Sequence, residues 1–130
     1  MDRDTMVIDG EEWVRKASIP AMQGSVMAPM KDGMRYCMVR TLYGGVFAGY
    51  LETLDDKHAV LRNARRMWYW DGAASLSELA TRGTSRPQNC KFPCAVERVE
   101  LADVIEVIDI TAKAKASIEG VPVWTEWTGK

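Results

Sequence analysis

The chain has 130 residues, of which 47% are hydrophobic and 27% charged, and its net charge at pH 7 is −1. This size and composition predict one globular domain with a hydrophobic core. The balanced charge provides no general attraction to nucleic acid or to an acidic membrane surface. No apolar run approaches the roughly 18–20 residues of a membrane span, and the acidic first residues are not typical of a signal peptide. We therefore expect a cytoplasmic protein without a membrane segment.

The residues that carry most catalytic and metal chemistry are scarce. The chain has three cysteines, Cys37, Cys90 and Cys94, and its single histidine is His58. A structural zinc site needs four such ligands, so all four would have to converge. The sequence contains no dinucleotide-type or phosphate-loop glycine motif, and nothing places His58 beside a cysteine as its base. We expect reduced cysteines, no metal, no cofactor, no catalytic residues and no enzymatic activity.

Residues 1–34 are predicted to form an N-terminal arm, ahead of a single ligand-binding domain over 35–127. Within the arm, residues 7–14 contain an Asp-Gly turn signal and predict a small hairpin. Residues 17–34 contain prolines, glycines and four methionines without periodicity, which is typical of a linker. Alternatively, these methionines pack on a neighbouring subunit, since methionine adapts to irregular surfaces.

The first part of the domain has the pattern of antiparallel strands. Two strand-like runs, 36–43 and 46–53, flank a Gly-Gly pair and predict a tight hairpin. After a turn at 55–57, a third strand is expected to begin near residue 58 and run towards residue 70. Because this is longer than a usual strand, we expect a bulge or bend near Asn63.

Short helices and further strands are expected after residue 74. A capping box at Ser75 and Glu78 predicts a helix that ends before Gly83. Thr111 is expected to cap a second helix, which ends at Gly120. Strands are predicted around 94–101 and 104–110 and in the tail at 123–127. The fold class is therefore predicted as α+β, mainly an antiparallel sheet with two short helices.

The most distinctive stretch combines arginines with aromatic residues. Three arginines lie within 62–66, and Trp68, Tyr69 and Trp70 follow. If 64–70 is an extended strand, its side chains alternate between two faces. One face then carries Arg66, Trp68 and Trp70, and the other carries Arg65, Met67 and Tyr69.

Guanidinium groups beside flat indole rings suit a ligand that has both phosphates and bases. The predicted helix at 76–82 begins directly after this stretch, so its free N–H groups add partial positive charge nearby. The alternative is that the tryptophans belong to the core and the arginines form a solvated edge, because tryptophan is usually well buried.

Several motifs together resemble those of a known protein family. They are Arg40-Thr41 with the Gly44–Gly49 hairpin, Asn63–Ala73 followed by Ser75-Leu76, and Pro87-x-Asn89. Over roughly residues 36–124 the chain resembles small phage proteins, including domains of unknown function, and is identified as a member of the Thoeris anti-defence protein 1 family.

The resemblance implies a phage-encoded sponge. Such proteins bind glyco-cyclic ADP-ribose, made by bacterial TIR-domain enzymes, and hold it without cleavage; some also bind cyclic di- or trinucleotides. The resemblance further implies homo-oligomers with pockets at subunit contacts, acting in the cytoplasm of the infected bacterial host.

Eight residues are candidates for the ligand site. Arg65 and Arg66 are assigned to phosphates, with Arg62 or Arg40 in support. An adenine is expected to stack on Trp68 or Trp70, Leu79 to line the pocket, and Asn89 to contact a base edge or ribose. Leu79 as a core residue and Asn89 as a turn residue are the alternatives.

Two other functions compete with the sponge. A structural or assembly protein of a phage particle would have a large apolar contact and no nucleotide ligand. A single-stranded nucleic-acid binder would also interleave arginine with aromatic residues, but the near-zero net charge argues against it.

Overall fold

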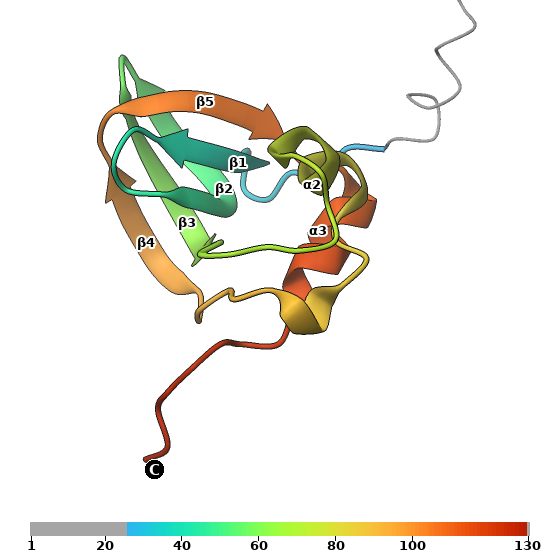
Figure 1. The fold of residues 1–130 in the computed structure, drawn as a ribbon. Helices are drawn as coiled ribbons and strands as arrows, with labels where there is room; N and C mark the ends of the chain where they lie inside the picture. Colours follow the sequence, from blue (N-terminus) through green and yellow to red (C-terminus); the bar gives the residue numbers. More distant parts are fainter. Residues whose placement is uncertain (1–25, 130) are drawn as a thin grey trace, which may run out of the picture.

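The computed structural model describes residues 26–129, so the hairpin predicted at 7–14 lies outside the described residues. A five-stranded antiparallel sheet in the order β4-β3-β2-β1-β5 is combined with two helices (Figure 1). This confirms the predicted α+β class. Neither helix is long and apolar enough to cross a membrane. The elements are β1 (Arg35–Thr41), β2 (Val46–Asp55), β3 (His58–Arg66), α2 (Leu76–Arg82), the 3-10 turn η1 (Pro87–Asn89), β4 (Val96–Leu101), β5 (Val104–Asp109) and α3 (Ala112–Glu119).

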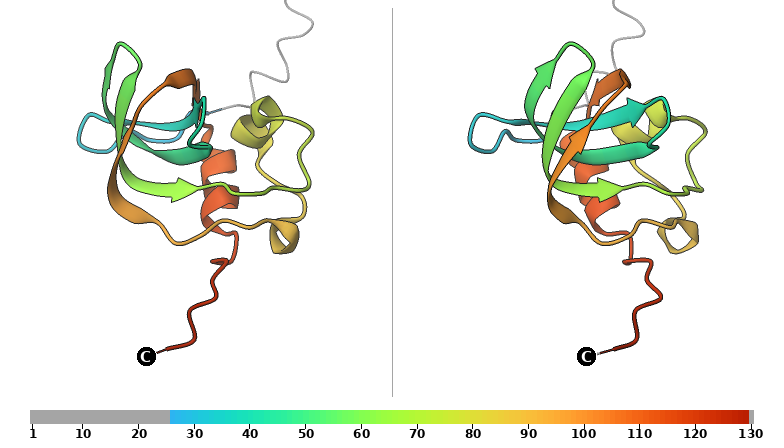
Figure 2. Two further views of the ribbon diagram at one scale, coloured as in Figure 1. Left: turned by 60° about the vertical axis from the view of Figure 1, so that its left-hand side comes forward. Right: turned by 90° about the vertical axis from the view of Figure 1, so that its left-hand side faces the viewer.

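The sheet curls, so each of its two faces covers a separate part of the core. The edge strands β4 and β5 follow one another through a tight turn at 102–103 (Figures 1 and 2). The inner face encloses one cluster, whose members include Cys37, Val39, Phe47, Leu51, Leu61 and Leu101. The outer face packs against both helices in a second cluster, which includes Tyr36, Met38, Tyr50, Met67, Leu79, Phe92 and Ile118.

The bulge expected near Asn63 is present. Arg62 pairs with Tyr50 and Arg65 pairs with Ala48, so β3 contains one more residue than β2 across this step. Asn63 has a φ of +50°, a left-handed conformation that asparagine tolerates better than most residues. The extra residue interrupts the alternation of side chains along β3.

The bulge places the arginines of β3 on different faces. Arg66 pairs with Phe47 on the inner face, whereas Arg62 lies on the outer face. Gly49 sits opposite the bulge, and a Cβ there would lie 3.0 Å from the Cα of Ala64. The close approach of the two strands therefore depends on glycine at this position.

Both helices begin and end at the predicted signals. The Ser75 hydroxyl accepts a hydrogen bond from the Glu78 amide, and the Glu78 carboxylate accepts one from the Ala74 amide. Gly83 follows α2 with a φ of +84°, where a side chain would be strained. Thr111 caps α3 by accepting a hydrogen bond from the amide of Ala114. These capping contacts satisfy backbone groups that a short helix leaves free.

Residues 26–34, expected to belong to a linker, instead lie against β5 and α3. The Ala28 amide donates to the Ile110 carbonyl at 3.0 Å, and the Ala112 amide donates to the Val26 carbonyl at 2.7 Å. Ala28 is buried in the outer-face cluster. Its burial and these backbone hydrogen bonds hold the segment on the domain, which the proline and glycine pattern did not indicate.

The tail strand predicted at 123–127 does not form. Val123 makes one isolated bridge to Phe92, and the chain then runs away from the body (Figures 1 and 2). Trp127 is exposed. The tail has the alternation of apolar and polar residues that a strand needs, but beyond Val123 no neighbouring strand among residues 26–129 pairs with it.

The guanidinium group of Arg65 connects three segments inside the domain. It is buried and donates to four backbone carbonyls: Pro93 at 3.0 Å, Ile118 at 2.8 Å, Phe92 at 3.0 Å and Val121 at 2.7 Å. Ile118 lies in the last turn of α3, where carbonyls carry partial negative charge. Burial lowers the pKa of Arg65, so these carbonyls are what stabilise the buried cation.

Replacement of this buried cation should destabilise the fold strongly. We expect Arg65→Met to lower the free energy of unfolding by roughly 3–5 kcal/mol, because several buried carbonyls lose their donors. Urea denaturation followed by tryptophan fluorescence measures the change. Arg62→Met is the matched control: Arg62 makes a more exposed ion pair with Glu52, so its loss should cost less than about 1 kcal/mol. Equal effects of the two variants would contradict the structural role of Arg65.

Candidate functional site

Three segments that are distant in sequence lie side by side at one end of β3. Tyr69 forms an isolated bridge with Lys91, and Phe92 forms one with Val123. The Trp124 amide donates to the Phe92 carbonyl at 3.0 Å. This arrangement brings together the side chains of Tyr69, Lys91 and Trp124, which we call the aromatic–lysine cluster.

The Lys91 ammonium lies near two aromatic rings. Its Nζ is 6.0 Å from the ring centre of Tyr69 and 5.6 Å from that of Trp124. Both rings are partly exposed, Tyr69 by 50% and Trp124 by 39%. No carboxylate in the described part of the chain forms an ion pair with Lys91. The rings orient the cation, and its charge is available to an anionic ligand.

An open groove of about 460 Å³ adjoins the cluster. Pro93, Cys94, Val123 and Trp124 supply its apolar wall, and Thr125 and Glu126 are its polar lining residues. This volume lies within the range of roughly 300–1,000 Å³ that is usual for small-molecule sites. The groove therefore offers apolar surface for a flat ring beside a cation for a phosphate.

Arg66 and Trp68 lie on the exposed side of the same segment, two residues apart. The Arg66 guanidinium donates to the Gly44 carbonyl and lies 4.3 Å from the ring centre of Phe47. Trp68 is 64% exposed. Trp70 is only partly exposed and packs against the outer-face cluster, so Trp68 is the better stacking surface of the two.

Two of the sequence-predicted site residues are placed in the core. Arg65 was assigned to phosphate, but four of its N–H···O contacts go to backbone carbonyls, which gives it a structural role. Leu79 was expected to line the pocket, but its side chain is fully buried between α2 and the sheet. Because neither reaches an open surface, we remove both from the candidate site.

The two supporting arginines lie in ion pairs away from the aromatic–lysine cluster. Arg40 donates from Nε to a Glu106 carboxylate oxygen at 3.0 Å. Arg62 makes the corresponding contact with Glu52, and this contact lowers the pKa of the Glu52 carboxyl. The bulge at Asn63 places Arg62 on the sheet face opposite Arg66, so these two arginines cannot hold one phosphate together.

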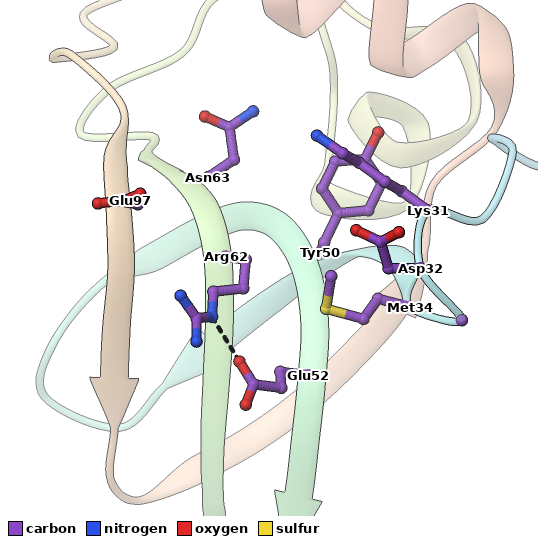
Figure 3. A pocket seen from close by; sticks show the side chains of 9 residues that line it. Lys31, Asp32, Met34, Tyr50, Glu52, Arg62, Asn63 and Glu97 are labelled. Atoms are coloured by element: carbon purple, nitrogen blue, oxygen red, sulfur yellow. Dashed lines mark hydrogen bonds and ion pairs between the residues drawn. The ribbon is translucent and has the colours of Figure 1, made fainter.

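Arg62 lines a second open groove, of about 650 Å³, shown in Figure 3. Two cations and three carboxylates surround it, because the groove is also lined by Lys31, Asp32, Glu52 and Glu97. Arg62 points to Glu52 (Figure 3), and the Lys31 ammonium lies 5.7 Å from the ring centre of Tyr50. The surplus of carboxylates makes this groove unfavourable for a phosphate-bearing ligand.

Asn89 has a local partner that explains its position. Its side-chain amide donates to the Asp71 carboxylate at 3.0 Å. Together with the Gly72 amide and Arg86, this hydrogen bond holds the pKa of the Asp71 carboxyl below its usual value. Asn89 thus connects the turn after Trp70 to the loop that carries Lys91, and this contact favours a positioning role for it.

Removal of the Asn89 amide should raise the pKa of Asp71. A lowered carboxyl pKa stabilises the folded state above the unfolded pKa of roughly 3.9, and this contribution is lost as the pH falls through the folded value. NMR titration of the Asp71 side-chain carbon in wild type and Asn89→Ala measures the shift. Gln88→Ala is the control, and it should leave the titration unchanged. An unchanged Asp71 pKa in Asn89→Ala would contradict the contact.

Sequence reasoning assigned no member of the aromatic–lysine cluster to the ligand site. Tyr69 was recognised as part of the motif but was given no ligand contact, although its side chain is half exposed. Lys91 lies in a loop and Trp124 in the tail, and no local signal joins either to Tyr69. Only the packing of the three segments could reveal the cluster.

The comparisons with known proteins identify one family. A family model described as "Domain of unknown function (DUF6948)" matches residues 34–118. The matched range contains Tyr69 and Lys91 but ends before Trp124. No curated protein and no solved structure matches the chain.

Proposed function

We propose that this chain, which belongs to the DUF6948 family of domains of unknown function, binds a cyclic nucleotide signal and holds it without cleavage. The proposed ligand is glyco-cyclic ADP-ribose made by TIR-domain enzymes, in the cytoplasm of a phage-infected bacterium. The observation that supports the proposal is the Lys91 ammonium beside two exposed aromatic rings and an apolar groove.

The chemistry of the surface matches the two parts of such a ligand. A base can stack on Trp124 or Trp68, because any base offers a flat π-face to an aromatic side chain. Phosphate oxygens can pair with Lys91, which has no carboxylate partner in the described part of the chain. Arg66 can supply further donors beside Trp68.

The energies indicate that one copy is not sufficient. Sequestration requires about nanomolar affinity, near −12 kcal/mol. The one adenine of the ligand contributes roughly 1–3 kcal/mol by stacking, and two charge-assisted contacts contribute about 3–6 kcal/mol. These gross values fall short of the requirement even before the costs of association. We therefore include a second subunit in the proposal, as the wall that closes the open groove.

The residues on this surface favour binding over turnover. Cys94 and Glu126 both line the groove, but hydrolysis by a thiol needs a base in hydrogen-bond contact with it. The single histidine, His58, starts β3 at the end opposite the aromatic–lysine cluster. The surface presents the Lys91 cation and the rings of Tyr69 and Trp124, and these groups suit binding of an intact ligand.

A phage assembly protein is the second candidate function. Val123, Trp124 and Trp127 expose apolar side chains on a tail that runs away from the body (Figure 1). Such a tail could insert between other proteins of a particle. This alternative requires no affinity for nucleotides.

Loss of the cation or of the indole should weaken ligand capture. We expect wild type to bind glyco-cyclic ADP-ribose in a calorimetric titration, and Lys91→Gln and Trp124→Ala to raise the Kd by about 10-fold or more. Heating the complex should release the ligand intact. Arg82→Gln is the control, because Arg82 lies on α2 away from the cluster, and it should bind like wild type.

The outcomes separate the candidate functions. Recovery of a cleaved ligand would exclude a sponge. Absence of heat with this ligand and with cyclic oligonucleotides would favour the assembly protein. Binding of single-stranded nucleic acid that falls steeply with salt would indicate the third function considered from the sequence.

A further inference from the structure

β4 is an edge strand whose outer side is open. It pairs with β3 on one side, and no other backbone hydrogen bond to Val96–Leu101 is found among residues 26–129. Unpaired edges offer backbone donors and acceptors to another strand. We propose that β4 pairs antiparallel with β4 of a second copy of this chain, with Val99 at the centre of the pairing.

The side chains of β4 make this edge selective. Glu97, Arg98 and Glu100 are exposed, while Leu101 is buried. Charged residues protect edge strands from indiscriminate pairing, because most registers bring like charges together. Arg98 and Glu100 lie on one face, and their side chains form an ion pair at 2.8 Å. A partner strand must therefore present complementary charges in the same spacing.

Symmetry leaves few registers for two copies of β4. If the two-fold axis is perpendicular to the sheet, residues opposite each other must share a face. Pairing centred on Arg98 places that arginine opposite its own copy, and pairing centred on Glu100 does the same with glutamate. Pairing centred on Val99 places Arg98 opposite the partner's Glu100, and this occurs twice. Charge thus favours the Val99 register over its two neighbours.

The other edge of the sheet has no comparable pattern. The charged side chains of β5 are Glu106 and Asp109, and both are acidic. They already pair with Arg40 and Arg35 on β1. Self-pairing of β5 would bring carboxylates together without any cation from the same strand. Of the two edge strands, only β4 carries charges that are complementary to those of a second copy of itself.

This register also brings the second copy near the apolar groove. Val96, which is 44% exposed, would lie opposite the partner's Ala102. Cys94, two residues earlier, lines the groove beside Trp124. Pairing of β4 adds a subunit contact to the proposed function, but it does not itself depend on any ligand.

Charge reversal on β4 tests the pairing. We expect wild type, without ligand, to form a dimer in sedimentation velocity over a concentration series. Arg98→Glu and Glu100→Arg should each raise the dimer dissociation constant about tenfold or more, because two attractive pairs become repulsive. The double variant, Arg98→Glu with Glu100→Arg, should restore the dimer. Lys113→Glu, a charge reversal on α3, is the matched control.

Thermal unfolding verifies that each variant is folded, since the reversed residues are exposed. A monomeric wild type, or a double variant that stays as weak as the single ones, would overturn the proposal. A closed ring larger than a dimer would also overturn it, because two-fold pairing of β4 uses its only open side. Ligand titration of the same variants is a separate measurement, so failure of the dimer and failure of nucleotide binding can be distinguished.

Discussion

The buried guanidinium group of Arg65 holds together three parts of the domain that are distant in sequence. It joins β3 to the backbone at Phe92 and Pro93 and to the end of α3 through Ile118 and Val121. A cation in this position is stabilised by carbonyl dipoles, since the end of a helix carries partial negative charge. Lys91 directly precedes Phe92, and Trp124 follows Val121 by three residues. The hydrogen bonds of Arg65 therefore stabilise the fold and also position two residues of the candidate site.

The bulge at Asn63 determines on which face of the sheet each arginine of β3 lies. In a regular strand, Arg62 and Arg66 are four residues apart, so they would share a face and could contact one ligand together. With the bulge, Arg65 turns into the outer-face cluster and Arg66 lies at the exposed end of the inner face. The bulge at Asn63, which has a left-handed conformation, thus places Arg62 and Arg66 on opposite faces of the sheet.

The parts of the fold that were predicted correctly have local causes. The hairpin at Gly44-Gly45, the bulge at Asn63 and the caps at Ser75 and Thr111 each depend on residues close in sequence. The candidate site has a different origin. Arg65 was assigned to phosphate because it lies beside aromatic residues, but its partners are backbone carbonyls that no sequence pattern reveals. Lys91 became a candidate only because tertiary packing places the rings of Tyr69 and Trp124 near its ammonium group.

The distribution of charge, rather than its sum, determines which ligand each face can accept. The net charge is −1, yet the groove of Figure 3 is lined by three carboxylates and two cations, whereas the Lys91 ammonium lies near the rings of Tyr69 and Trp124. Coulomb energies fall with distance and are screened over about 8–10 Å at physiological salt. An anion at the aromatic–lysine cluster therefore responds mainly to Lys91 and its neighbours. A nearly neutral chain can in this way carry one local cationic surface although its charges nearly cancel.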